Sequence, residues 1–318
     1  MSTPPSPPAL QVPPVRAGRR PRRPAEPDER SVISTADRRR PSVRIVLVGV
    51  QTLILVGLVV AGLGPLLWLF KAALSTSQDI LRQPFALWPS GIQWDNLGIA
   101  WTRARIGFFL RNTAIVALGS WLANLFVSVT AAYVLSVLRP RWGPLLSGAI
   151  LVTLFIPSVV SLVPLYLTVL DLPLVGGSLL NTYWAVWLPA AANAFNVLVI
   201  KRFFDALPAE LFEAARIDGA GPVRILVSIV LPLSRPILAV VSLLTIIASW
   251  KEFLWPLLVL QRPDLQPLSV ALPQLTRTAE LNVQMAGLFL ALLVPVLLFL
   301  VFQRQFLRGV GMSGGVKG

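Results

Sequence analysis

The sequence predicts an all-α, polytopic membrane protein with six transmembrane helices, and three observations lead to this prediction. The 318 residues are 55% hydrophobic and only 13% charged, whereas a soluble domain carries roughly 25% charged residues. The mean hydropathy is +0.72. From Val43 onwards, apolar stretches recur that are long enough, at about twenty residues, to cross a bilayer core of about 30 Å. Together these features exclude a soluble globular domain.

Apolar run length places the six helices in order along the chain. They are expected at Val43–Phe70, Phe108–Leu138, Leu145–Leu170, Thr182–Ile200, Ile237–Leu260 and Leu281–Phe302. Nearly every span contains a proline, which removes a backbone donor and bends its helix. Bent spans suit either a bundle with a water-filled cavity or ordinary packing of membrane helices, and the sequence leaves both interpretations open.

Residues 1–42 form a separate region, rich in proline and arginine. Such a segment cannot bury enough apolar surface to fold, so we expect a disordered arm. Arginine clusters next to a span are held in the cytoplasm and contact anionic lipid headgroups. Juxtamembrane charge therefore accounts for the net charge of +14. A nucleic-acid-binding arm is the alternative, but no folded recognition module accompanies it, so no nucleic-acid partner is expected.

The even number of spans places both termini on the side of this arm. The loops on that side also carry an excess of Lys and Arg, which favours the cytoplasm. We therefore expect a transmembrane domain at residues 43–306 and a cytoplasmic tail at residues 307–318. The chain contains no Cys and no His, which excludes disulfides, thiolate chemistry, histidine bases and the common zinc sites. Few carboxylates remain in the spans, so we predict neither a catalytic residue nor a metal site.

The segment between the fourth and fifth spans, residues 203–235, is too polar to cross a membrane and is patterned as a helix–turn–helix. Pro208 suits the first turn of a helix, and Glu210 and Glu213 suit its positive N-terminal end. Gly219 is expected to end this helix in the left-handed conformation. Gly221 and Pro222 then begin a second helix, whose apolar stripe is predicted to be Val223, Leu226, Val227 and Val230.

One apolar side on such a segment favours docking in the groove of another protein. The alternative is a helix that lies on the lipid surface. Lipid-surface helices are usually rich in Lys and Arg on the polar face, whereas Glu210, Glu213 and Asp218 occupy this one. Docking is therefore the favoured interpretation.

The spacing within this segment resembles the cytoplasmic EAA loop of ABC importer permeases. The matching anchors are Glu213-Ala214-Ala215, Gly219, Ile229 and Leu231-Pro232. Around it, the chain is similar to the shorter membrane subunit of maltose-type carbohydrate importers. The similar stretches are Phe108–Ser120, Leu165–Leu172, Leu179–Val197, Ser249–Leu260 and Val316–Gly318.

The resemblance implies a type I ABC importer permease fold, with residues 203–235 as the coupling loop. It assigns contact with an ATPase to Glu213, Ala214, Ala215, Asp218, Gly219, Ile229, Leu231 and Pro232, with Glu213 paired to a basic residue of that partner. It also implies a second permease subunit in a heterodimer, an ATPase dimer and an extracytoplasmic solute-binding protein, in a bacterial or archaeal cell membrane. The chain has no phosphate-binding GxxxxGK[ST] loop. ATP and Mg²⁺ would therefore belong to the partner, and this chain would be a transport subunit and not an enzyme.

The candidate substrate path consists of polar residues inside the spans: Asn193, Trp250, Lys251 and Glu252. A charge at bilayer depth costs at least about 2.5–3.5 kcal/mol, so Lys251 and Glu252 should face protein or water. The alternatives are a local ion pair between them or snorkelling towards the outer surface. The family usually has Asn in place of Lys251. Asn193, together with Asn124 and Asn196, suits either the path or bonds between helices, the latter being favoured.

The function expected from this resemblance is import of a mono- or oligosaccharide. Glycerol phosphate is an alternative cargo. A lone ion-coupled secondary transporter is a further alternative, for which internal inverted repeats would be expected.

Overall fold

The computed structural model describes residues 41–173 and 176–311, so the arm at 1–40 and the last residues of the tail, 312–318, lie outside the described residues. The chain divides into two compact units, residues 1–61 and 62–318. In the first unit, residues 41–61 form the beginning of helix α1 (Pro41–Ala73). This stretch of α1 is apolar and exposed. Helix α1 confirms the first predicted span and extends it by a few residues at each end.

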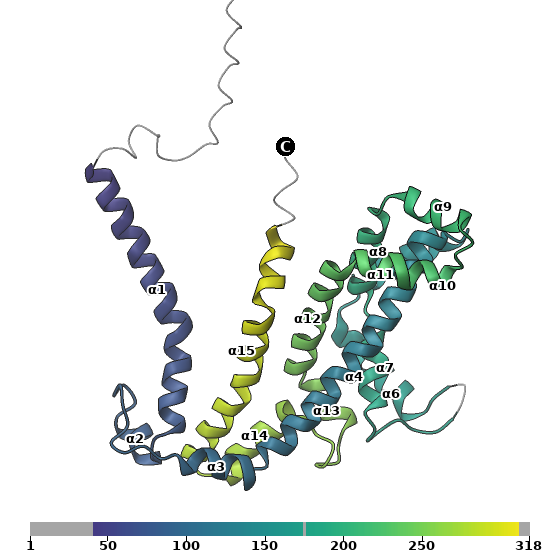
Figure 1. The fold of residues 1–318 in the computed structure, drawn as a ribbon. Helices are drawn as coiled ribbons and strands as arrows, with labels where there is room; N and C mark the ends of the chain where they lie inside the picture. Colours follow the sequence, from purple (N-terminus) through teal and green to yellow (C-terminus); the bar gives the residue numbers. More distant parts are fainter. Residues whose placement is uncertain (1–40, 174–175, 312–318) are drawn as a thin grey trace, which may run out of the picture. The chain divides into compact units, whose positions relative to one another are not determined.

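The second unit is built around α4 (Ile106–Tyr133), which continues as a π-helical turn, η2 (Val134–Leu138). Two short helices precede it, α2 (Ser77–Arg82) and α3 (Asp95–Thr102). Helix α4 packs against α7, α8 and α12, and so forms the centre of the bundle (Figure 1). Together α4 and η2 confirm the second predicted span, Phe108–Leu138.

The third predicted span is not one straight helix. It consists of α5 (Gly143–Thr153) and α6 (Ser158–Leu170), whose axes differ by 108°. Pro157 lies at the break, in an extended conformation at the N-cap of α6. A proline has no N–H to continue the first helix and restricts the residue before it, so the chain restarts there. Pro164 remains inside α6.

The fourth predicted span also consists of two helices, α7 (Trp184–Ala191) and α8 (Ala194–Asp205), bent by 43°. Asn193 lies in the break, and its side chain accepts a 3.0 Å hydrogen bond from the Asn196 N–H, which caps α8. An N-cap side chain satisfies a donor that the helix itself leaves free. The span therefore bends at a residue suited to begin a new helix.

The fifth predicted span, Ile237–Leu260, is shorter in the structure. Helix α12 (Arg235–Lys251) ends at Lys251, and a separate helix α13 (Leu254–Val259) follows. Glu252 is extended between them, with ψ of 124°. The prediction was wrong in placing Glu252 inside a continuous helix. The carboxylate accepts a 3.2 Å hydrogen bond from the Trp255 N–H at the start of α13, and such a bond favours a helix start over continuation.

Helix α14 (Leu268–Thr278) lies between α13 and the last helix, α15 (Leu281–Gly311). Helix α15 confirms the sixth predicted span and continues through the predicted end of the transmembrane domain at residue 306. In the second unit, α3, α13 and α14 lie at one end of α4, and α15 ends towards the other (Figure 1).

The described residues are helical and contain no β-strand. Three helices of the described residues are long and apolar enough to cross a membrane, and the total is up to six if each of three bent pairs is one span. The third bent pair joins residues 222–233, which belong to the segment between the fourth and fifth predicted spans, to α12 at 81°. The count is consistent with the predicted six spans, and the all-α class is confirmed.

Candidate functional site: a helix–turn–helix segment and a polar cavity

The helix–turn–helix segment, residues 203–235, begins with α9 (Ala209–Ile217). Pro208 is the N-cap residue, one position before the first helical residue. At the other end, the Gly219 N–H donates to the Arg216 carbonyl (3.1 Å) and the Ala220 N–H to the Ala215 carbonyl (2.9 Å). This pair of bonds is a Schellman motif, which needs a left-handed residue, and Gly219 has φ of +75°. The predicted helix end is confirmed.

The second helix of the segment consists of α10 (Pro222–Ile225), a π-helical turn η3 (Leu226–Val230) and α11 (Leu231–Leu233). The predicted apolar stripe of this helix divides between the core of the chain and its surface. Ile225 and Val230 are buried, whereas Val223 and Val227 are 74% and 55% exposed. The wider π turn shifts the register of the helix faces, so the buried face differs from that of a regular helix.

The segment is fixed to the end of the bundle by a shared core and by hydrogen bonds. The core joins Phe212, Ala215, Ile225 and Val230 to side chains of α4, η2, α8 and α12. The Tyr133 hydroxyl donates to the Pro222 carbonyl at 2.8 Å. Tyr133 is only 4% exposed, and this part-buried bond ties the start of α10 to α4.

A second set of polar contacts lies beside it. The Arg216 guanidinium donates to the Val137 carbonyl at 3.4 Å. Asp205 accepts from the Ser136 hydroxyl and from the Lys201 ammonium, both at 2.7 Å. These contacts tie α8 and α9 to the π-helical end of α4.

The predicted coupling residues divide into two groups in the structure. Glu213, Ala214, Asp218, Gly219 and Pro232 are exposed. Ala215 is buried, and Ile229 and Leu231 pack partly buried against the same core, so their contacts are with this chain. Ile217, which is 86% exposed beside the turn, was not among the predicted coupling residues. An isoleucine two residues before a predicted turn glycine was the available signal.

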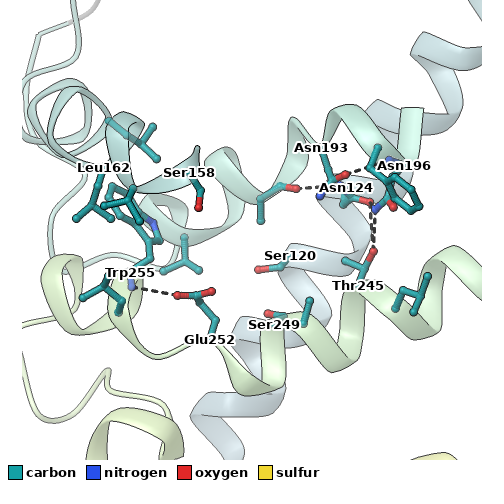
Figure 2. Close-up of a pocket in the computed structure, with 18 residues that line it drawn as sticks. Ser120, Asn124, Ser158, Leu162, Asn193, Asn196, Thr245, Ser249, Glu252 and Trp255 are labelled. Carbon is teal, nitrogen blue, oxygen red and sulfur yellow. Dashed lines mark hydrogen bonds between the residues drawn. The ribbon is translucent and has the colours of Figure 1, made fainter. Parts of the chain in front are cut away.

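A cavity of about 520 Å³ lies among α4, α6, α7, α8 and α12. Of the predicted path residues, Asn193 and Glu252 line it, whereas Trp250 and Lys251 do not. Its polar lining residues are Ser120, Asn124, Ser158, Asn193, Asn196, Thr245, Ser249 and Glu252 (Figure 2). The rest of the lining is apolar and includes Leu162 and Trp255. This is the composition and size of a small-molecule site.

A hydrogen-bonded cluster of three side chains, Asn124, Asn196 and Thr245, closes one end of this cavity. The Asn196 side-chain amide donates to Asn124 Oδ1 (2.8 Å) and to the Thr245 hydroxyl (3.1 Å). The Asn124 amide donates to the Ala190 carbonyl at 2.9 Å. Bonds between helices were the favoured prediction for Asn124 and Asn196, and the structure confirms them. Asn193 instead makes the local cap of α8.

Glu252 and Trp255 lie towards the other end. The Trp255 indole N–H donates to the Ala185 carbonyl at 2.9 Å, and the Ser269 hydroxyl donates to the Glu252 carbonyl at 2.7 Å. These bonds fix the extended Glu252 between α12 and α13. Within the described residues, Lys251 makes no ion pair with Glu252, so the local ion pair, one of the alternatives that the sequence left open, is not formed.

Ser120, Thr245 and Ser249 line the cavity but were not predicted as path residues. Ser120 and Asn124 are four residues apart on α4, and Thr245 and Ser249 are four residues apart on α12. Residues at this spacing share a helix face. Small polar side chains repeated at i, i+4 within apolar spans were therefore a usable signal.

The opposite end of the second unit carries a cationic surface. The guanidinium carbons of Arg105 and Arg111 lie 4.4 and 5.0 Å from the centroid of the Phe108 ring. The Arg262 guanidinium donates two hydrogen bonds to the Asp264 carboxylate, from Nε to Oδ1 at 3.1 Å and from Nη2 to Oδ2 at 2.7 Å. Hydrogen bonding from Arg262 lowers the pKa of Asp264 below its ordinary value. A second cavity of about 570 Å³ lies nearby, lined by residues that include Arg103 and Glu280.

Neither the helix–turn–helix segment nor the polar cavity has the side chains of a metal centre in the described residues. Across residues 41–173 and 176–311, no group of three or more Asp or Glu residues is placed to hold a metal ion. The arrangement therefore consists of a surface segment joined by α4 to a polar cavity inside the bundle. An arrangement of this kind suits a membrane permease that passes a solute between its helices.

Residues 115–311 match the family described as "Binding-protein-dependent transport system inner membrane component". The chain belongs to this family, which confirms the family predicted from its sequence. The match covers α4 from residue 115 and every later helix, and so contains both the helix–turn–helix segment and the residues that line the cavity.

The relatives are permease subunits. The chain is 32% identical over 270 residues to the "sn-glycerol-3-phosphate transport system permease protein UgpE" of Pectobacterium atrosepticum, covering 82% of this chain and 94% of the relative. It is 30% identical over 286 residues to the protein of the same name from Agrobacterium fabrum, covering 85% and 97%. A bacterial ABC transporter involved in import of the acidic polysaccharide alginate contains a chain of similar fold. The TM-score is 0.72 at 24% identity, over 83% of this chain and 98% of that chain.

Proposed function

We propose that this chain is a membrane-spanning subunit of a binding-protein-dependent ABC importer that carries a sugar into the cell. The observation that carries the proposal is the helix–turn–helix segment, which is exposed on one side and fixed to α4 on the other. Helix α4 also lines the cavity through Ser120 and Asn124. A force applied to the segment would therefore reach the solute site through one rigid element.

The exposed side of the segment supports docking on an ATPase. Glu213 and Asp218 offer negative charge, and Ile217 and Val223 offer apolar surface that the chain itself leaves uncovered. A short amphipathic helix of this kind suits a groove in a partner. Glu213 would pair there with a basic residue.

The remaining partners follow from the same proposal. A separate ATPase dimer would bind ATP and Mg²⁺, a second permease would complete the translocation path, and an extracytoplasmic protein would deliver the solute. Both termini and the helix–turn–helix segment would lie in the cytoplasm. Glycerol phosphate is the alternative cargo, favoured by the names of the relatives.

The test combines purification with a charge reversal. Affinity purification from the native membrane should recover a nucleotide-hydrolysing subunit with this chain. Glu213→Lys should abolish solute uptake while membrane insertion stays normal, because a lysine would face the partner's basic residue. Uptake is measured with the complete importer in membrane vesicles.

Glu280→Lys is the matched control, because Glu280 is an exposed glutamate between α14 and α15, outside the helix–turn–helix segment. It should leave hydrolysis of ATP unchanged. Normal uptake by the Glu213 variant would contradict the coupling role. Uptake driven by a proton or sodium gradient by this chain alone would instead support a secondary transporter.

A further inference from the structure

We propose that the cavity among α4, α6, α7, α8 and α12 is a binding site for an uncharged, hydroxyl-rich solute and excludes anions. The inference rests on the proposed function only in that the solute passes through this cavity. It differs from what the names of the relatives suggest, because glycerol 3-phosphate is an anion.

The charge of the cavity lining disfavours an anionic solute. Glu252 is the one ionisable side chain among the residues that line the cavity, and no Lys or Arg lines it. An anionic solute would meet a carboxylate without a compensating cation, in surroundings whose low dielectric strengthens the repulsion. Phosphate sites in proteins use arginine, lysine or converging backbone N–H groups. The charge of this cavity therefore opposes a phosphate or carboxylate group.

Hydroxyl and amide groups line the same cavity from several helices. Thr245 and Ser249 are four residues apart on α12 and share one helix face, and Glu252, which follows the end of α12, lines the same cavity. Ser120 and Asn124 line the cavity from α4. Figure 2 shows Ser120, Ser158 and Glu252 directing oxygen atoms towards the same space.

The hydroxyl group of Ser120 is a buried polar group without a partner among the described residues. Ser120 is only 1% exposed. A buried hydroxyl without a partner is costly, and a ligand hydroxyl is a suitable partner because it both donates and accepts. Leu162, Leu254 and Trp255 line the cavity beside these groups. Apolar and aromatic surface next to hydroxyl-binding groups fits the carbon faces and hydroxyl edges of a sugar ring.

The charge of the cavity is tested with the full chain in membranes. Because the sequence contains no cysteine, an introduced cysteine supplies the one thiol of the chain. Ser249→Cys places a single thiol beside Glu252. The measured quantity is the rate of modification by a cationic methanethiosulfonate reagent divided by the rate with an anionic one. This ratio should be about tenfold higher for the introduced thiol than for a free thiol in solution. In the double variant with Glu252→Gln, this preference should disappear. A matched control, Ser228→Cys, lies exposed on the helix–turn–helix segment, and its ratio should not respond to Glu252→Gln.

The class of solute is tested by protection of the same thiol. Glucose, maltose and trehalose are compared with glycerol 3-phosphate. At least one neutral sugar should slow modification of Ser249→Cys, glycerol 3-phosphate should not, and Glu252→Gln should weaken the protection about tenfold. Ser120→Ala should weaken it in the same direction.

Three results would overturn the inference: no effect of Glu252→Gln on the reagent preference, protection by glycerol 3-phosphate at least equal to that by the sugars, or no protection by any sugar. The proposed function fails by a different measurement, namely absence of ATP-driven uptake by the assembled importer. The two failures are therefore distinguishable.

Discussion

At the scale of single residues, close packing between α4 and α7 depends on Gly119. A Cβ atom at this position would lie 2.1 Å from Cε2 of the Trp187 ring. Real side chains do not tolerate such a distance, so the indole and α4 approach each other only because the glycine has no side chain. The resulting contact helps to hold α7 next to the cavity.

We expect Gly119→Ala to destabilise the protein by about 1–3 kcal/mol, because the added methyl group forces the rigid indole aside. Thermal unfolding of the detergent-solubilised chain measures the effect. Gly148→Ala is the matched control, because nothing lies within 4 Å of its added Cβ. That substitution should be neutral or stabilising. An equal response from both variants would contradict the packing argument.

The hydrogen-bonded cluster of Asn124, Asn196 and Thr245 is a second feature at the scale of single residues. We expect Asn196→Leu to cost about 0.6–1.7 kcal/mol, the range measured for hydrogen bonds between membrane helices. The bond to Asn124 predicts that the double variant Asn124→Leu/Asn196→Leu loses less stability than the sum of the single variants. Additive losses in the same unfolding assay would show that the 2.8 Å bond contributes nothing.

At the scale of elements, the turn of the helix–turn–helix segment shows the difference between a required glycine and a tolerated one. Gly219 has φ of +75°, whereas Gly221 is extended with φ of −71°. Neither has an atom within 4 Å of an added Cβ. The backbone conformation alone therefore distinguishes them.

Gly219→Ala should destabilise the turn by about 1 kcal/mol, because an L-residue with a side chain resists the left-handed conformation. Gly221→Ala should have no such effect and is the matched control. Hydrogen exchange at Gly219 and Ala220, whose N–H groups close the turn, measures the opening of α9 directly. Faster exchange in the Gly221 variant alone would refute the assignment.

The broken spans show how far element boundaries followed from sequence. Proline content predicted bent helices, and Pro157 does mark the 108° break between α5 and α6. Pro65, Pro164 and Pro295 nevertheless remain inside continuous helices. Whether a proline bends or breaks a membrane helix depends on which neighbouring groups satisfy the freed carbonyl, and these groups belong to other elements.

At the scale of the whole molecule, the arm at residues 1–40 lies outside the described residues and its role is a prediction from the sequence. Deleting residues 2–40 should preserve solute uptake, because lipid contact by the arginines is not part of the solute path. Uptake is compared at equal levels of inserted protein, measured by membrane fractionation. Complete loss of uptake with normal insertion would show that the arm has a function in transport.

The sequence predicted the helix–turn–helix segment well and the cavity only in part. The helix–turn–helix segment was found because caps, turn glycines and charges are local signals along the chain. The cavity was harder to find: Asn193 and Glu252 were identified as polar residues in apolar spans, but Trp250 and Lys251 were included with them. Thr245 and Ser249 line the cavity from α12, and Trp250 and Lys251 lie on a different face of the same helix, because successive helical residues are rotated by about 100°.

The sequence by itself determined the all-α class, the six apolar spans and the position of the turn at Gly219, because hydropathy and backbone conformation act over a few residues. Only the tertiary structure decided which spans break, which face of the second helix is exposed, and which polar groups meet around Ser120. Those outcomes depend on contacts between residues far apart in the chain, such as Asn124 with Asn196 and Tyr133 with Pro222. No local pattern records such pairs.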